Sequence, residues 1–508
     1  MPKTSIGGFT LSYIMALDQG TSSSRAIIYT HDGETVSVAQ HAFNMVFPAD
    51  GWVEQDPETL WRTTLQSGRD AIADAGITAQ EISCIGITNQ RETTLVWDRN
   101  TGRSVYNAIV WQDRRTADRC AHMRGDTLQG VPLEEALAER TGLVIDPYFS
   151  STKLAWILRN VAGTRERAQH GELCFGTVDT YLIWRLTNGG AHVTDATNAS
   201  RTQLFNIRSQ QWCSELLEYF EIPPAVLPEV SDSAGLFGIA DAEWFGAQIP
   251  ITGVAGDQQA ALVGQGCFQP GMTKSTYGTG CFVIAHTGDE ALSSGNQLLT
   301  TVASRLDGNV SYGLEGSVFV AGSAVQWLRD ELRIIDSAPQ TEPIAAATGV
   351  VDDVHVVPAF AGLGAPWWDA HARGAILGLT RGSGRDEIVT ATLQAIAYQT
   401  YDLIEAMTDD GIAPSVLRVD GGMVANAWFL QFLADILDTP VERPENVEST
   451  VLGAAFLAGL AAGVVESTDV IADLWRRDRL FEPAMNQDQR ESLLAGWSTA
   501  VTRVRGSR

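Results

Sequence analysis

Short apolar runs alternate with longer amphipathic stretches through most of the chain. Residues 82–90 (ISCIGITNQ) and 249–257 (IPITGVAGD) are apolar runs that end in polar residues, which is typical of buried strands. Residues 57–76 and 385–411 repeat apolar positions at helical spacing and close on a Gly, which predicts amphipathic helices. Regular alternation of such strands and helices predicts an α/β fold built in layers.

A polar turn interrupts the first apolar region. YIMALD at residues 13–18 precedes it and RAIIYT at residues 25–30 follows it, so the pattern predicts strand, turn and strand. A flexible Ser-rich linker would be polar on both sides. A turn rich in Gly, Thr and Ser presents N–H groups and hydroxyls that bind anions, so a phosphate site is one interpretation. An ordinary surface hairpin is the other.

The second half of the chain repeats this arrangement. Residues 272–286 (MTKSTYGTGCFVIAH) again place a turn of Gly, Ser and Thr between apolar flanks. Residues 417–437 then predict a strand, a Gly pair that admits a close ligand, and a helix. Two halves of this kind indicate a duplicated domain facing one nucleotide. A chance likeness between two Gly-containing hairpins is the alternative.

Length and composition narrow the function classes. A chain of 508 residues predicts more than one domain, and a net charge of −26 argues against a nucleic-acid surface. The lysines are Lys3, Lys153 and Lys274, and none completes a G-x-x-x-x-G-K-[ST] motif. Because G-x-G-x-x-G, H-R-D and D-F-G are also absent, the sequence excludes P-loop, dinucleotide-binding and protein-kinase architectures.

The cysteines and the apolar segments bear on the compartment. Six cysteines without a C-x-x-C pair predict buried free thiols in a reducing compartment. The first 13 residues lack the apolar core of a secretory signal. The longest apolar run, residues 451–465, is shorter than the roughly 20 residues of a membrane span and predicts a closely packed buried helix. We therefore expect a cytoplasmic protein.

Several motifs occur in one order along nearly the whole chain. They include ALDQGTSSSRA, GITNQRETT, NAIVWQDRRTA, TGLVIDPYFS, FGTVDTYLIWRLT, VAGDQQAAL, YGTGCF and VDGGMVAN. With YFSSTKLAWILRN at 148–160 and residues 374–394, they resemble the FGGY carbohydrate kinases, and among these the members that phosphorylate glycerol. The resemblance implies a duplicated actin-like, ribonuclease-H-like fold, with domains at 1–260 and 261–508 and the active site in the cleft between them.

The resemblance also implies the reaction. It is the transfer of a phosphoryl group from ATP, with Mg²⁺, to glycerol, which gives sn-glycerol 3-phosphate. Asp257 is implied as the general base and, together with Asp18, as a metal ligand. By position alone, Asp257 would more often simply cap the helix that follows it, and Asp18 would initiate a turn.

The implied acceptor pocket suits a three-carbon triol. Arg91 supplies hydrogen-bond donors and Glu92 supplies acceptors for neighbouring hydroxyls, while Trp111 and Phe282 cover the carbon chain. Gln19 and Gln258 assist around the metal and the acceptor. The full implied acceptor set is Arg91, Glu92, Trp111, Tyr148, Asp257, Gln258 and Phe282.

The nucleotide contacts implied by the resemblance lie in the two hairpins and in the Gly-containing turns of the second half. They are Thr21, Ser22, Ser23, Arg25, Thr279, Gly322, Gln326, Gly422 and Asn426. Family members are commonly dimers or tetramers, so we expect a homodimer or homotetramer without nucleic-acid partners.

Two other functions stay open from the sequence. One is a sister FGGY kinase acting on a pentulose, a hexulose or gluconate, and the other is an actin-like ATPase without a small-molecule acceptor. Some relatives are implied to carry a basic loop that binds fructose 1,6-bisphosphate or a His that is phosphorylated. Residues 209–273 contain no Lys, Arg or His, so we expect neither form of regulation in that segment.

Overall fold

The computed structural model describes residues 12–360, 362–369 and 371–505. The chain forms two compact units. Unit 1 holds the residues up to 266, and two later segments, residues 301–312 and 449–474, return to it. Unit 2 holds residues 267–300, 313–448 and those from 475 onward.

Unit 1 is built on a six-stranded sheet. Its strand order is β15-β16-β5-β1-β2-β3. The central strands β1 (Tyr13–Gln19), β5 (Ile82–Asn89) and β16 (Ile249–Gly256) run parallel, so their carboxyl ends meet at one edge. The flanking strands β2 (Ser23–Tyr29), β3 (Thr35–Ala42) and β15 (Ala234–Ala240) are antiparallel to their neighbours.

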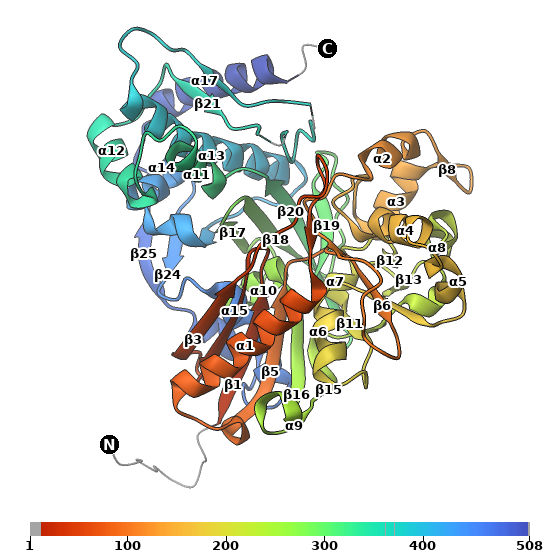
Figure 1. Cartoon of the computed structure of the whole chain (residues 1–508). Helices are drawn as coiled ribbons and strands as arrows, with labels where there is room; N and C mark the ends of the chain where they lie inside the picture. Colours follow the sequence, from red (N-terminus) through yellow and green to blue (C-terminus); the bar gives the residue numbers. More distant parts are fainter. Residues whose placement is uncertain (1–11, 361, 370, 506–508) are drawn as a thin grey trace, which may run out of the picture. The chain divides into compact units, whose positions relative to one another are not determined.

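Helices cover both faces of this sheet (Figure 1). Helix α1 (Pro57–Ala75) packs on β1, β2 and β3, and α15 (Ser449–Ala461) packs on β1, β5 and β16. Successive side chains of β1 alternate between the two faces of the sheet. Leu17 therefore points toward Gly68 of α1, and Ile14 points toward Gly459 of α15. The buried helix predicted over residues 451–465 is present as α15, which ends at Ala461, before exposed residues of the following turn.

Helix α15 packs so closely against its neighbours that the contact positions have no room for a side chain. A Cβ added to Gly86 of β5 would lie 2.1 Å from the carbonyl oxygen of Ala454. A Cβ added to Gly453 would lie 1.8 Å from the carbonyl oxygen of Ala260 in helix α10 (Asp257–Gly264). Glycine at these positions therefore fixes α10 and α15 against each other and against the sheet.

A seven-stranded sheet of order β19-β20-β18-β17-β23-β24-β25 lies mainly in unit 2, and the parts of β19 and β20 within residues 301–312 belong to unit 1. Its strands are β19 (Leu299–Leu306), β20 (Asn309–Val318), β18 (Cys281–Gly288), β17 (Thr273–Tyr277), β23 (Leu417–Asp420), β24 (Val441–Pro444) and β25 (Arg477–Phe481). Helices α13 (Arg385–Asp409), α14 (Ala427–Leu437) and α17 (Gln487–Val504) complete its core, in which Tyr398 stacks on Trp497 with ring centroids 5.3 Å apart.

Both predicted hairpins are confirmed. Strands β1 and β2 pair around residues 20–22, where the N–H of Gly20 donates to the carbonyl of Ser23 at 2.9 Å. Strands β17 and β18 pair around residues 278–280 in the same way. The Ser-rich stretch is therefore a structured turn and not a linker.

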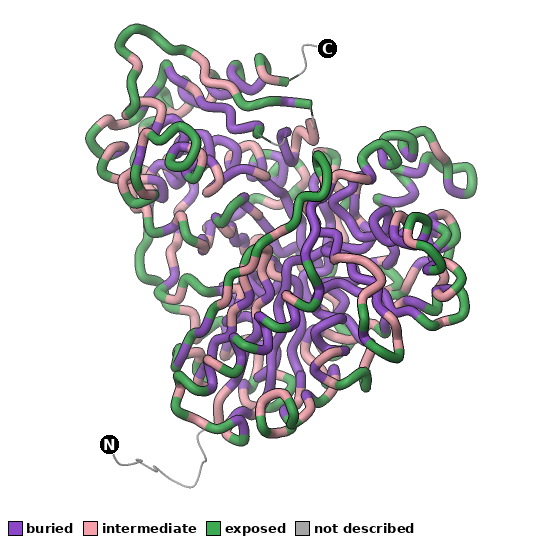
Figure 2. Tube along the Cα trace, viewed as in Figure 1, coloured by how far each residue is buried: buried purple, intermediate pink, exposed green. Residues whose placement is uncertain are grey.

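Burial follows the apolar pattern (Figure 2). All six cysteines are buried and unbridged, as predicted. Within the described ranges, the longest apolar helices fall short of what a membrane crossing requires.

Candidate functional site

The candidate site in unit 1 lies where the parallel strands end. In register, Gln19 of β1 and Gly256 of β16 both stand opposite Asn89 of β5. Residues 20–22, 90–92 and 257–258 follow these strand ends directly. The carboxyl edge of parallel strands is where open α/β sheets place their ligands, so the three predicted segments gather at the expected place.

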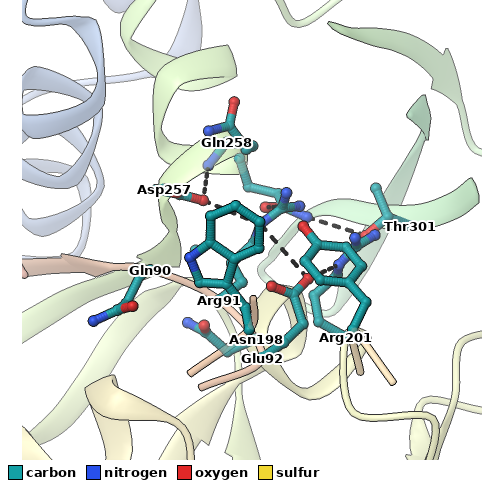
Figure 3. Close-up of polar contacts among 12 residues, drawn as sticks. Gln90, Arg91, Glu92, Asn198, Arg201, Asp257, Gln258 and Thr301 are labelled. Carbon is teal, nitrogen blue, oxygen red and sulfur yellow. Dashed lines mark hydrogen bonds and ion pairs between the residues drawn. The ribbon is translucent and has the colours of Figure 1, made fainter. Parts of the chain in front are cut away.

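Asp257 begins helix α10 directly after β16. Its Oδ1 accepts the N–H of Gln258 at 2.7 Å and lies 3.0 Å from Nε of Arg91 (Figure 3). The Asp257 side chain is 33% exposed, whereas that of Arg91 is 2% exposed. Gly256 occupies the N-cap position, so Asp257 is not the capping residue of this helix. A carboxylate that is fixed by a buried arginine and is still partly exposed is suited to accept a proton from a bound ligand.

Arg91 reaches Asp257 by passing over a glycine. Its Nη1 donates to Oε1 of Gln259 at 3.2 Å. A Cβ added to Gly256 would lie 2.7 Å from both Cγ and Cδ of Arg91, so only glycine leaves this path open. The buried guanidinium is thereby fixed between two acceptors on α10.

Glu92 is buried and held by a second arginine. Its Oε1 lies 2.6 Å from Nε of Arg201, which is itself fully buried, and 4.0 Å from Nε of Arg91. The backbone of Glu92 adopts φ 59°, a left-handed conformation that turns the chain sharply after β5. Two buried guanidinium groups and two carboxylates therefore form one charged cluster (Figure 3).

Two aromatic residues of the predicted acceptor set pack together in unit 1. The rings of Trp111 and Tyr148 meet edge to face with centroids 5.7 Å apart, and the Arg201 guanidinium lies 5.7 Å from the centroid of the Tyr148 ring. The Trp111 indole N–H donates to Oγ1 of Thr21 at 3.0 Å. A predicted acceptor residue thus contacts a predicted phosphate residue.

Buried glutamines fix the first hairpin. Nε2 of Gln90 donates to Oε1 of Gln19 at 2.9 Å and to Oε1 of Gln55 at 2.8 Å. Nε2 of Gln55 donates to the carbonyl of Thr21 at 2.7 Å. Because buried amides must satisfy their donors, this network holds the turn between β1 and β2 in one conformation.

The remaining predicted hairpin residues lie at the turn or in the strands beside it. Asp18 is partly exposed near the end of β1 and stands opposite Arg25 in the strand pairing. Ser22 is exposed at the turn, and the Ser23 hydroxyl accepts a hydrogen bond from Gln40 at 2.8 Å.

A buried polar layer supports the junction of β16 and α10. Asp195 caps the short helix α7 (Ala196–Ala199) and accepts the N–H of Thr197 at 2.9 Å. The Thr197 hydroxyl in turn accepts the N–H of Gly256 at 2.9 Å. Burial raises the pKa of Asp195, and it raises the pKa of the neighbouring Asp179 to about 6.

Unit 2 holds a cavity of about 350 Å³. It contains all five residues predicted for the nucleotide in the second half. Its lining residues are Tyr277, Gly278, Thr279, Gly322, Val325, Gln326, Arg329, Ala338, Pro339, Thr341, Glu342, Leu393, Gly422, Met423, Ala425 and Asn426.

Close backbone contacts build this cavity. The N–H of Gly322, which begins helix α11 (Gly322–Asp330), donates to the carbonyl of Gly278 at 2.9 Å, and a Cβ on Gly322 would lie 2.5 Å from that oxygen. Oδ1 of Asn426 accepts the N–H of Phe429 and caps α14, while its Nδ2 donates to Thr341 at 3.2 Å. Hydrogen bonds therefore join the second hairpin to α11 and Asn426 to helix α12 (Thr341–Thr348).

Phe282 lies in unit 2. It stands opposite Thr276 in the β17–β18 pairing and is partly exposed. Its role as a cover for the acceptor stays a prediction.

Sequence reasoning missed several residues of the site. Arg201, Gln55 and Gln259 belong to no spacing pattern that predicts a site, and only the fold brings them to the sheet edge. The one available signal was their place beside recognised motifs, as for Gln259 in GDQQAAL.

The chain is similar to known proteins over nearly its whole length. Residues 13–264 match the model of the FGGY family of carbohydrate kinases, N-terminal domain, and residues 273–462 match the C-terminal domain. A protein named glycerol kinase from Ectopseudomonas mendocina is 60% identical over 97% of this chain and 99% of its own length. A protein named glycerol kinase 1 from Pseudomonas aeruginosa is 59% identical with the same coverage.

Solved structures give the same picture. The crystal structure of Plasmodium falciparum glycerol kinase with ADP is 34% identical, with a TM-score of 0.89 over 98% of this chain and 99% of that one. A xylulose kinase from Lactobacillus acidophilus, at 22% identity and a TM-score of 0.86 over 98% of this chain and 99% of its own, shares the fold. The α/β fold predicted from the sequence is confirmed, and the chain belongs to the FGGY family of carbohydrate kinases.

Proposed function

We propose that this chain transfers the γ-phosphoryl group of ATP to glycerol and releases sn-glycerol 3-phosphate and ADP. The observation that carries the proposal is the partly exposed Asp257 carboxylate, held by the buried Arg91 beside Glu92 at the carboxyl edge of the sheet. The names of relatives at 54–60% identity over nearly the whole chain support glycerol as the acceptor.

The unit 1 residues suit a small polyol. Arg91 supplies N–H donors and Glu92 supplies carboxylate acceptors to neighbouring hydroxyls, and the Trp111 ring covers the C–H faces between them. Tyr148 narrows the pocket against Trp111, which favours a three-carbon acceptor over a pentulose or hexulose. Gln258 and Phe282 complete the proposed acceptor set.

Asp257 is the proposed general base. One of its oxygens accepts the proton of the attacking hydroxyl as the bond from that oxygen to phosphorus forms. The fixed Arg91 contact holds the carboxylate in position without occupying its exposed side. Proton removal then coincides with attack on the γ-phosphorus.

The nucleotide is proposed to bind two sets of residues. Thr21, Ser22, Ser23 and Arg25 bind its phosphates through hydroxyl, backbone and guanidinium donors. Thr279, Gly322, Gln326, Gly422 and Asn426 line the unit 2 cavity, which is concave enough for a nucleoside. The related structure solved with ADP supports this assignment.

The carboxylates of Asp18 and Asp257 fit a magnesium ion. Both are partly exposed oxygen donors at the same sheet edge, and Mg²⁺ takes one or two carboxylates together with substrate phosphates. Within the described ranges, no three His, Cys, Asp or Glu side chains gather into a dedicated metal cage, which agrees with such a shared site. When bound, the ion neutralises phosphate charge.

Product identification tests the proposal. The chain is incubated with ATP, Mg²⁺ and glycerol, and the products are followed by ³¹P NMR and by an enzyme specific for sn-glycerol 3-phosphate. We expect equal amounts of ADP and sn-glycerol 3-phosphate. A spectrum that shows ADP and inorganic phosphate, without a phosphomonoester, would refute it.

A further inference from the structure

Lys153 holds the backbone of an acceptor-site residue. It lies in the first turn of helix α4 (Ser150–Asn160) and its side chain is 0% exposed. Nζ of Lys153 donates to the carbonyl of Tyr148 at 2.5 Å and lies 3.4 Å from the carbonyl of Pro147. The N–H of Tyr148 donates to Oδ1 of Asp146 at 2.9 Å. Both polar backbone groups of Tyr148 are thus bound by charged side chains.

A lysine is an unfavourable choice at this position. Burial in a low-dielectric interior penalises an ammonium group, and the first turn of a helix repels cations. A side chain in a helix points back toward the N-terminus, so this lysine reaches the two carbonyls that precede α4. Methionine would fill most of the same space at lower electrostatic cost, so what a lysine supplies here is a donor to the two carbonyls and a positive charge beside nearby carboxylates.

The charges around Lys153 balance it incompletely. Burial lowers the pKa of Lys153 to about 8. The nearby carboxylates of Glu92, Asp113 and Asp146 act to raise this pKa, and the nearby Arg114 acts to lower it. Nη1 of Arg114 lies 2.8 Å from Oδ1 of Asp146 and fixes that carboxylate. The ammonium therefore loses its proton at a lower pH than an exposed lysine does.

The first turn of α4 also ties Tyr148 to Glu92. The Ser150 hydroxyl donates to the carbonyl of Glu92 at 3.0 Å. The Tyr148 ring contacts Trp111, and the guanidinium that pairs with Glu92, that of Arg201, lies near the same ring. A shift of the Tyr148 backbone would therefore move one wall of the pocket relative to its charged groups.

We propose that Lys153 is a positioning residue for the acceptor: its ammonium fixes the Tyr148 carbonyl and so sets how the Tyr148 ring packs against Trp111 in the proposed acceptor pocket. The inference rests on the proposed function of that pocket. It predicts that loss of the Lys153 contact weakens binding of the acceptor and leaves binding of the nucleotide little changed.

The test compares Lys153→Met with Thr152→Val. Lys153→Met keeps the length of the side chain and removes its donors. Thr152→Val removes the 2.8 Å contact with Thr116 from the same turn and leaves Tyr148 untouched. For Lys153→Met we expect the acceptor KM to rise by about tenfold or more, with kcat and the ATP KM within about threefold. Thr152→Val is expected to stay close to wild type.

The pH profile supplies a second readout. As the ammonium deprotonates above pH about 8, the wild-type acceptor KM should rise, and Lys153→Met should not show this step. If Lys153→Met does not fold, the wild-type profile decides, and a flat acceptor KM from pH 7 to about pH 9.5 overturns the inference. With folded protein, an unchanged acceptor KM in Lys153→Met, or an equal rise in Thr152→Val, overturns it.

The test of Lys153 can succeed or fail independently of the proposed function. All ratios are measured with the acceptor that wild type turns over best. If that acceptor is not glycerol, the proposed function fails, while the comparison of Lys153→Met with wild type still tests the positioning role.

Discussion

At the scale of single residues, the site depends on charged groups that are buried on one side and open on the other. The side chains of Arg91 and Arg201 are nearly or fully buried, whereas that of Asp257 is one-third exposed. Buried ion pairs of this kind contribute little net stability, but they fix the geometry of the exposed member. Residue-level predictions therefore concern turnover and affinity more than folding.

Asp257→Asn removes the proposed base while it keeps the shape of the side chain. We expect kcat to fall by about a hundredfold or more, because general-base catalysis contributes roughly 10²–10⁴. Initial rates of ADP formation over a glycerol series measure it, with Asp241→Asn, at the exposed cap of α9 (Ala242–Phe245), as the control. Turnover within about twofold of wild type would contradict the assignment.

Trp111→Ala removes the apolar wall and the indole N–H together, whereas Trp111→Phe keeps a smaller aromatic ring and removes the N–H that binds Thr21. We expect the alanine variant to raise the glycerol KM by about tenfold or more, since truncating a packed aromatic side chain costs several kcal/mol. The phenylalanine variant should retain most of the affinity for glycerol. A larger rise in the ATP KM than in the glycerol KM would show that the wall is misplaced.

At the scale of elements, hydrophobic patterning predicted the framework, because strands buried on both faces form continuous apolar runs and amphipathic helices repeat apolar positions at helical spacing. The strands at 82–90 and 249–257, both hairpins and the helices at 57–76 and 385–411 all formed as predicted. The return of residues 449–474 to unit 1 was not predictable from periodicity, because it depends on contacts between segments far apart in the chain. The roles of Gln55, Arg201 and Lys153 were not predicted for the same reason, because only tertiary contacts distinguish them from ordinary polar residues.

The packing of α10 on α15 gives an element-scale prediction. Gly453→Ala would place a Cβ 1.8 Å from the Ala260 carbonyl oxygen, so the helices must separate. We expect a loss of about 1–3 kcal/mol in the free energy of unfolding, as for other overpacked cores. Urea denaturation measures it, with Gly125→Ala as the control, because a Cβ there meets its nearest neighbour at 3.6 Å. Equal stability of the two variants would contradict this packing.

At the scale of the whole molecule, each unit carries a distinct part of the chemistry. Unit 1 holds the charged cluster and the first hairpin, and unit 2 holds the cavity that contains every predicted second-half nucleotide residue. The fold followed from recognisable motifs in the sequence, whereas the charged cluster includes Arg201, which lies on no pattern that predicts a site. The net charge of −26 affects how strongly the chain binds other anions.

We predict little inhibition by fructose 1,6-bisphosphate. The segment from β15 to β16 contains no basic residue, and Asp241 there caps α9. Two arginines outside this segment, Arg165 and Arg167, already pair with Glu221 and Asp98. An anion with about four charges is poorly held without cationic donors. Rates at rising effector concentration and physiological salt test this, and saturable inhibition at micromolar effector would contradict it.

The most direct test of the central claim is the acceptor dependence of ADP formation. A coupled assay compares kcat/KM for glycerol, dihydroxyacetone, glyceraldehyde, xylulose and gluconate, with a reaction lacking any acceptor as the baseline. We predict the highest kcat/KM for glycerol and a far lower rate without an acceptor, because Asp257 needs a bound hydroxyl to deprotonate. A higher kcat/KM for xylulose or gluconate, or ADP formation that does not depend on the acceptor, would contradict the account.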